Sequence, residues 1–224
     1  MIFGKIEYLN LLPFHIFMKR FTKMSAAKMS MEYKKNVPAK INKAFHQHQV
    51  DAAFISSIMA QKSSHVGLGI VAKKNVKSVL VIPNTESKKD NESASSNILA
   101  EILQLQGEVL IGDKALRYAL KNDNYIDLAE TWYKRYKLPF VFALLCYHKD
   151  KKLYTKIEKE FLKSPVKIPQ YILYNASQKT SIAKADILEY LTLISYELNA
   201  KTALGVKKFY KLARTKRISN KYKK

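Results

Sequence analysis

The stretch from Gly4 to Phe14, GKIEYLNLLPF, decides the fold class of this chain. Apolar residues that suit a strand come at its start and just before it: Ile2, Phe3, Ile6 and Tyr8. Pro13 then begins a helical pattern, because proline suits the first turn of a helix. The apolar residues that follow repeat at the spacing of one helix face: Phe14, Phe17, Met18 and Phe21. The stretch therefore predicts a strand, a tight turn that holds Asn10, and a helix.

Asn10 is the polar residue of this predicted turn. In an open α/β sheet such a turn lies at the carboxyl end of a strand, where ligands bind. An Asn amide can donate and accept hydrogen bonds without a change of charge. The alternative is a turn residue that caps its own backbone. The local pattern alone favours the cap, and both interpretations stay open here.

Composition indicates a globular protein. Hydrophobic residues make up 47% of the 224 positions, with 14 Tyr and 10 Phe, which is enough to bury a core in one or two units. The sequence contains no apolar run long enough to span a membrane and no secretory signal pattern at its start. Cys146 is the single cysteine and lies in an apolar run, so we expect a buried strand residue. These features predict a cytoplasmic protein.

The formal net charge is +22. Such a charge suits nucleic acid, anionic lipid or a small anion. Only five of the 40 basic residues are Arg, and planar recognition of bases depends on Arg. We therefore expect no specific nucleic-acid partner, although the basic segment 207–224 keeps nucleic-acid binding open as a rival. Most of the lysines are expected to be solvated surface residues.

Predicted strands and helices alternate along the chain. The strands fall at 29–33, 50–55, 66–71, 76–82, 109–111 and 140–147, and helices begin near 38, 93, 112, 128 and 187. The last helix is predicted from the spacing of Ile187, Leu188, Leu191, Ile194 and Leu198. This order predicts βαβ units and a largely parallel sheet. The polar segment 84–97 is interpreted as a linker into a smaller unit.

Motifs for metals and nucleotides are missing from the sequence. His46 and His48 stand two positions apart, a spacing that does not share a helix face. There is no HExxH motif, no GxGxxG motif and no phosphate-binding P-loop. We therefore expect no metal and no cofactor.

Hydroxyl and carboxyl residues follow the predicted strands or precede helices. They are Ser56, Ser57, Ser93, Ser95, Ser96 and Asp113, and Ser78 interrupts the predicted strand at 76–82. A helix N-terminus with free amides and hydroxyls is a ready carboxylate site. Ordinary helix capping is the alternative for each residue taken singly.

Several segments, taken in order, carry a resemblance to a known family. They are G-x-I-x-Y-L-N-x-L-P-F at 4–14, VDAAFISS at 50–57, VKSV at 76–79, SASS at 93–96, LIGDKAL at 110–116 and LPFVFA at 138–143. Together these motifs resemble the chorismate dehydratases of the futalosine route to menaquinone. Ser95 stands where that family has Thr.

The resemblance implies an α/β fold of the two-lobed, periplasmic-binding-protein-like type II class, with a cleft between the lobes. Residues 1–83 and 140–224 would form the larger lobe and 84–139 the smaller one. Strands at 76–82 and 140–146 would cross between the lobes as the hinge. The gap at 101–109 is shorter than in the family, so we expect a trimmed second lobe.

The resemblance also implies the chemistry. The substrate would be chorismate, a small anion, and loss of water would give 3-[(1-carboxyvinyl)oxy]benzoate. We expect Asn10 to be catalytic. The expected substrate-binding residues are Tyr8, Ser56, Ser57, Ser78, Ser93, Ser95, Ser96 and Asp113. Two alternatives stay open, a non-catalytic binding protein for a small aromatic carboxylate and the sister 1,4-dihydroxy-6-naphthoate synthase, and the sequence indicates no oligomeric state.

Overall fold

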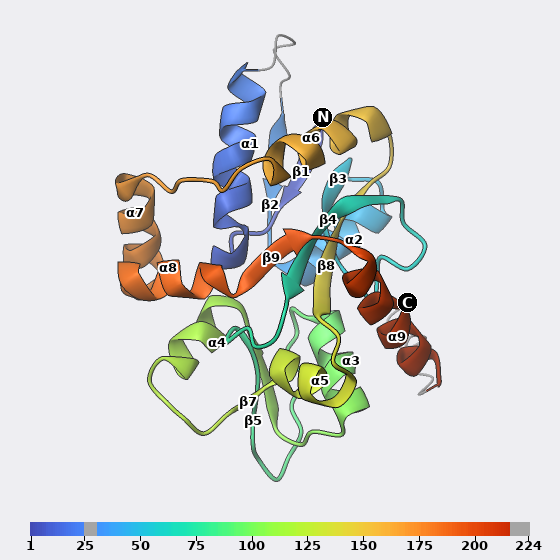
Figure 1. Cartoon of the computed structure of the whole chain (residues 1–224), viewed down its shortest axis with the longest axis vertical. Coiled ribbons are helices and arrows are strands. Elements are labelled where there is room, and N and C mark those ends of the chain that lie inside the picture. The colour runs from blue at the N-terminus through green and yellow to red at the C-terminus, as the bar shows by residue number, and fades with distance from the viewer. Residues whose placement is uncertain (25–30, 216–224) are drawn as a thin grey trace.

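The computed structural model describes residues 1–24 and 31–215. The described chain forms a six-stranded mixed sheet and a three-stranded antiparallel sheet (Figure 1). The larger sheet has the order β2-β1-β3-β8-β4-β9: β1 Ile2–Lys5, β2 Glu32–Lys35, β3 Ala52–Ser56, β4 His65–Ala72, β8 Phe140–Tyr147 and β9 Ile194–Glu197. The smaller sheet has the order β6-β5-β7: β5 Val79–Ile82, β6 Glu108–Ile111 and β7 Ile126–Asp127.

Helices surround both sheets. Those before β5 are the short 3-10 helix η1 Leu9–Leu11, α1 Leu12–Met24 and α2 Pro38–His46. Those between β5 and β8 are α3 Ala94–Leu103, α4 Gly112–Ala119 and α5 Leu128–Tyr136, which gather around the smaller sheet (Figure 1). The rest are α6 Lys151–Leu162, α7 Gln170–Thr180, α8 Lys184–Thr192 and α9 Ala200–Thr215. Within the described ranges, no helix is both long and apolar enough to cross a membrane.

The larger sheet is not largely parallel, so that prediction was wrong. Strand β1 pairs in parallel with β2 and β3, but β8 runs antiparallel to both of its neighbours, β3 and β4. The reason is topological. Strand β8 brings the chain back from the smaller sheet, so it enters the larger sheet in the opposite direction to the strands on either side. Strands β3 and β4 are joined by turns rather than by a crossover helix.

The chain passes between the sheets twice. It leaves the larger sheet after β4 and returns to it in β8, so the links are the segments 73–78 and 137–139. Strand β5 pairs with β6 and β7 only, among the described strands. The side chain of Asp127 holds the first link, because its Oδ2 atom accepts hydrogen bonds from the amides of Val76 and Lys77 at 2.8 and 2.7 Å. The division into lobes 1–83 with 140–224 and 84–139 stays a prediction.

The predicted helix from Ile187 to Leu198 is only half right. Helix α8 ends at Thr192, and Ile194 then begins β9, which pairs with Ala72 on the edge of β4. Pairing with that edge overrides the helical spacing of the apolar residues. Leu188, which was placed on the apolar face, is 46% exposed. The predicted strand at 29–33 lies partly outside the described residues, and β2 begins at Glu32.

The opening stretch is anchored by Phe14. Its fully buried ring packs edge-to-face against Phe54 and Phe161, with ring centroids 4.9 and 5.2 Å apart. This contact fixes the start of α1 against the larger sheet, and so it fixes η1, the turn just before. Cys146 is buried in β8 as predicted, and burial raises the pKa of its thiol to about 12.

Candidate active site

A cavity lies between the two sheets. Its volume is about 70 Å³. Six of the predicted site residues line it: Tyr8, Asn10, Ser56, Ser78, Ser93 and Ser96. Its apolar wall consists of Ile6, Leu11, Pro38, Phe54, Ile70, Val76, Val79, Ile111, Phe142 and Ala143. The arrangement suits a ligand with an apolar ring and a few polar groups.

Three helices present their N-termini to this cavity. Pro38 is the first residue of α2, Ser93 caps α3, and Gly112 is the first residue of α4, and all three residues line the cavity. The first amides of a helix have no partner within it, and the helix dipole makes that end positive. In the described structure no Lys, Arg or His is part of the lining. Among the lining groups, the helix N-termini are therefore the ones that suit a carboxylate.

Asn10 lies in η1 and faces this cavity. Its Oδ1 atom is buried and has no hydrogen-bond partner among the described residues. The backbone carbonyl of Asn10, by contrast, accepts a hydrogen bond of 2.7 Å from the hydroxyl of Tyr196. The Asn10 amide therefore does not cap its own turn through Oδ1. Instead the structure leaves a side-chain oxygen without a partner on a residue of the cavity lining.

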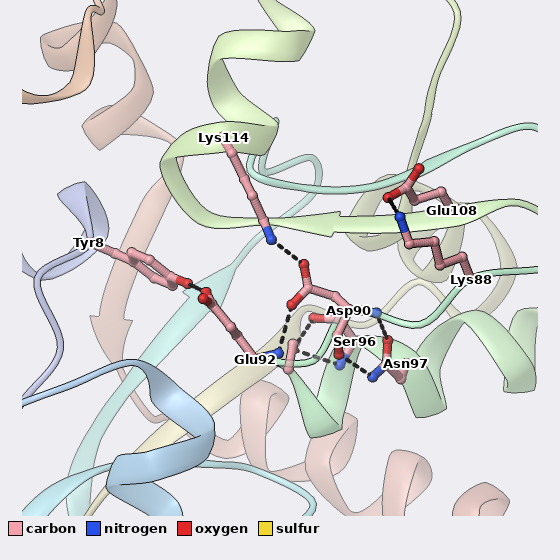
Figure 2. Close-up of polar contacts among 9 residues, drawn as sticks. Tyr8, Lys88, Asp90, Glu92, Ser96, Asn97, Glu108 and Lys114 are labelled. Carbon is pink, nitrogen blue, oxygen red and sulfur yellow. Dashed lines mark hydrogen bonds and ion pairs between the residues drawn. The ribbon is translucent and has the colours of Figure 1, made fainter.

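Tyr8 connects the two units beside the cavity. Its ring lies against Gly112, where an added Cβ atom would come within 2.8 Å of the ring. Its hydroxyl donates a hydrogen bond to the carboxylate of Glu92, as Figure 2 shows. Burial, followed by the contact with Glu92, raises the pKa of Tyr8 far above its ordinary value. The phenol therefore stays protonated and acts as a donor.

The remaining predicted residues lie behind the wall and join the units. The hydroxyls of Ser57 and Ser95 are 3.0 Å apart, and the Ser95 oxygen also accepts from the amide of Ile58 at 3.2 Å. Asp113 accepts a 3.0 Å hydrogen bond from the amide of Leu9. Burial raises the pKa of Asp113. These three predicted residues are not part of the cavity lining.

The loop before α3 is held by a buried carboxylate that the sequence did not reveal. Asp90 pairs with Lys114 at 2.7 Å and accepts from the amide of Glu92 at 2.8 Å (Figure 2). Asn97 brackets the same residue, since its side chain bonds both the amide and the carbonyl of Asp90 at 3.0 and 2.7 Å. Segment 84–97 is thus more than a linker. It sets the start of α3 at Ser93.

Two more residues were missed, Asn42 and Tyr190. Asn42 is buried in α2 and bonds Ser56, and Tyr190 is buried in α8 and bonds Ser78. Asn42 left one signal in the sequence, an amide next to the apolar stripe of Ile41 and Phe45. In the described structure, no three His, Cys, Asp or Glu side chains gather in a way that could hold a metal ion.

Comparison with known families decides the family of this chain. Residues 1–106 and 93–215 match the model of a family described as menaquinone biosynthesis. The chain belongs to this menaquinone biosynthesis family. It is 45% identical over 215 residues to a chorismate dehydratase of Campylobacter jejuni subsp. jejuni, and the match covers 94% of this chain and 96% of the relative.

Solved structures show the fold of this family member. A protein of Archaeoglobus fulgidus has a TM-score of 0.70 at 11% identity, with 97% of each chain covered. A Candida albicans protein, described as having the generic periplasmic binding protein fold, has a TM-score of 0.58 at 15% identity, with 99% of this chain and 94% of that chain covered. The α/β fold of the periplasmic-binding-protein-like class, predicted from the resemblance, is confirmed.

Proposed function

We propose that this protein is a chorismate dehydratase, a carbon-oxygen hydro-lyase that converts chorismate into 3-[(1-carboxyvinyl)oxy]benzoate. The observation that carries the proposal is the 45% identity to a chorismate dehydratase over 94% of the chain. The cavity supports it, because an apolar wall and three helix N-termini suit a ring that carries carboxylates. Two carboxylates on the ligand would also match the positive net charge of +22.

The reaction needs little from the protein beyond positioning. The ring loses its hydroxyl group and the hydrogen on the neighbouring ether-bearing carbon, and these leave as water. The electrons of the broken C–H bond complete an aromatic ring, which drives the step. No His–carboxylate pair lines the described cavity, so we assign the removal of the proton to a carboxylate of the substrate itself, which passes it to the departing hydroxyl group. Holding that carboxylate over the C–H bond can contribute several kcal/mol.

The side chains divide this work. The N-termini of α2, α3 and α4, with the hydroxyls of Ser56, Ser78 and Ser96, hold the carboxylates, and Ser93 orients Ser96. Asn10 orients the leaving hydroxyl through its unpaired Oδ1 atom. Tyr8 covers the ring from the side of α4. The same proposal includes a cytoplasmic location, a small anionic partner and no specific nucleic-acid partner.

The deciding experiment incubates the purified full-length protein with chorismate. We expect a new benzoate chromophore and a product lighter than chorismate by one water in mass spectrometry. Binding of chorismate without a product would instead assign a non-catalytic binding protein. Release of a naphthoate from the substrate of the sister 1,4-dihydroxy-6-naphthoate synthase, with no reaction of chorismate, would assign that activity.

A further inference from the structure

We propose that Asn42 and Tyr190 are positioning residues that set the hydrogen-bond direction of two serines in the cavity wall. Each donates a hydrogen bond to a serine oxygen, at Ser56 and Ser78 respectively. Each serine therefore keeps its own hydroxyl hydrogen for an acceptor in the cavity. This device selects ligands that present carboxylate oxygens and disfavours ligands that present N–H groups. The identity of the carboxylate ligand rests on the proposed function.

The direction of the hydrogen bond between Asn42 and Ser56 is unambiguous. Its backbone amide lies 3.1 Å from Asn42 Oδ1, and a backbone amide can only donate, so that atom must be the amide oxygen. The other atom is then Nδ2, which can only donate, and it lies 2.8 Å from the Ser56 oxygen. Asn42 and Ser56 are both buried, so this pair is fixed. The Ser56 oxygen is thus an acceptor toward Asn42, and its hydrogen is free to donate elsewhere.

The hydrogen bond between Tyr190 and Ser78 has the same direction, with the serine oxygen as acceptor, because Tyr190 is buried. The hydroxyl of Tyr190 lies 2.9 Å from the Ser78 oxygen. If Ser78 donated, the buried phenol hydrogen would need another acceptor, and none is found for it in the described residues. Buried polar hydrogens are almost always paired. Ser78 lines the cavity, where its hydrogen can reach a ligand, and Tyr190 does not line it, so the phenol donates. Burial also raises the pKa of Tyr190 well above its ordinary value, which keeps that hydrogen in place.

A third hydroxyl repeats the pattern at the start of α3. The Ser93 oxygen accepts from the amide of Ser96 at 3.2 Å, and the Ser93 hydroxyl donates to the Ser96 oxygen at 2.7 Å. Ser96 therefore also keeps its hydrogen for the cavity. The three serines come from different elements, and all of them line the same cavity. Neutral hydroxyls supply donors here without the desolvation cost of a buried lysine.

The first experiment is a double-mutant cycle on Tyr190 and Ser78. Binding of 3-hydroxybenzoate and of 3-hydroxybenzamide is measured by calorimetry for Tyr190→Phe, Ser78→Ala and the double variant. The wild type is expected to prefer the benzoate. Tyr190→Phe should weaken benzoate binding about 3- to 10-fold, the scale of one hydrogen bond, and change benzamide binding less. In the Ser78→Ala background, Tyr190→Phe should have no further effect.

Tyr154→Phe is the matched control. Tyr154 is as buried as Tyr190, but its hydroxyl contacts the sulfur of Met1 at 3.0 Å and is not part of the cavity wall. This variant should leave both affinities unchanged. The inference is wrong if the losses of binding free energy caused by Tyr190→Phe and Ser78→Ala are additive. It is also wrong if Tyr190→Phe weakens the binding of both ligands equally.

The second experiment tests Asn42 with Asn42→Asp. The new carboxylate still accepts a hydrogen bond from the Ser56 amide. Because a carboxylate has no donor, the Ser56 hydroxyl would donate to it and no longer to a ligand in the cavity. Benzoate binding should weaken, and the loss should be smaller in the Ser56→Ala background, where a pure charge effect would persist in full. An equal loss in both backgrounds would overturn the inference.

These binding measurements are independent of catalysis. A protein that shows both couplings but never dehydrates chorismate would retain the inference and lose the proposed reaction. A protein that dehydrates chorismate with fully additive variants would retain the reaction and lose the inference.

Discussion

The hydroxyl of Tyr8 donates a hydrogen bond to the carboxylate of Glu92, across the cleft between the two sheets (Figure 2). Two further links join the same units. The amide of Leu9 donates to Asp113 at 3.0 Å, and the hydroxyls of Ser57 and Ser95 meet at 3.0 Å. Three hydrogen-bonded contacts therefore join the two units around the cavity. We expect a ligand that enters or leaves the cavity to break some of these contacts.

Tyr8→Phe tests this role of the Tyr8 hydroxyl. The ring would keep its place against Gly112, but the link to Glu92 would be lost. We expect the dissociation rate of a bound aromatic carboxylate to rise about 3- to 10-fold, the scale of one hydrogen bond, in stopped-flow measurements. Tyr118→Phe is the control, because the Tyr118 hydroxyl bonds the carbonyl of Asn124 at 3.4 Å on the surface, away from the cavity lining. An unchanged dissociation rate in Tyr8→Phe would show that this bond does not hold the cleft closed.

Gly112→Ala should be harmful for two separable reasons. Gly112 has φ of +69°, a left-handed conformation that costs an alanine about 1–2 kcal/mol. The added Cβ atom would also meet the Tyr8 ring at 2.8 Å. We expect lower stability in denaturant unfolding, together with weaker ligand binding.

The Tyr8→Ala background separates these two costs of Gly112→Ala. Removal of the ring relieves the clash, but the backbone strain remains. Gly112→Ala should therefore cost less stability in Tyr8→Ala than in the wild type. Equal costs in both backgrounds would mean that the ring contact is not tight.

His15 should make stability depend on pH. Its Nε2 atom donates to the carbonyl of Ile6 at 2.8 Å, and its Nδ1 atom is buried without a partner among the described residues. Burial lowers the pKa of His15 to about 4 from the ordinary 6.5. Between these values the unfolded chain binds the proton and the folded protein does not, so stability falls as the pH drops from 6.5 toward 4. The loss should reach roughly 3 kcal/mol.

Denaturant unfolding at several pH values measures this slope for the wild type and His15→Gln. The variant should lose most of the slope between pH 6.5 and 4. Glu7 does not contribute to the slope between pH 6.5 and 4, because its contact with Lys179 holds the pKa of Glu7 at about 2, below the ordinary 4.5. Stability that depends on Glu7 is lost only as the pH falls from 4.5 toward 2. A slope that survives in His15→Gln would contradict the assignment to His15.

Local patterns in the sequence carry the parts of this fold that depend on near neighbours. The Phe14 face of α1 and the cap at Ser93 could be predicted, because spacing and capping are properties of adjacent residues. The carboxyl-end turn with Asn10 followed from the same logic. The β9 strand could not be predicted, because Ile194 is held by a pairing with Ala72, more than a hundred residues earlier.

The tyrosines that bond site residues could not be predicted from the sequence for the same reason. Tyr190 and Ser78 are 112 positions apart, and Tyr196 and Asn10 are 186 apart. Nothing near Tyr190 or Tyr196 in the sequence distinguishes these residues from ordinary core tyrosines. The serines and Asn10 could be nominated as ligand contacts, but the residues that orient them appear only once the chain is folded.

Asn10→Ala is the most direct test of the proposed chemistry. Removal of this side chain breaks no bond at Oδ1, which has no partner in the described structure, and the bond from Tyr196 goes to the backbone and survives. The melting temperature should therefore change little. Turnover of chorismate should fall about 100-fold or more, the scale seen when one oriented polar group of an active site is lost.

Asn10→Asp is the stricter probe, because the side chain keeps its shape while a negative charge faces an anionic substrate. The cavity wall described here offers no lysine or arginine to neutralise that charge, so the variant should bind chorismate less tightly or turn it over more slowly, and still fold. Steady-state kinetics and thermal melts on Asn10→Ala and Asn10→Asp separate the two roles open to this residue. A sharp drop in melting temperature with full turnover would make Asn10 a structural residue of η1. Intact folding with lost turnover would leave Asn10 acting on the substrate, because the Tyr196 contact that holds its backbone is the same in both variants.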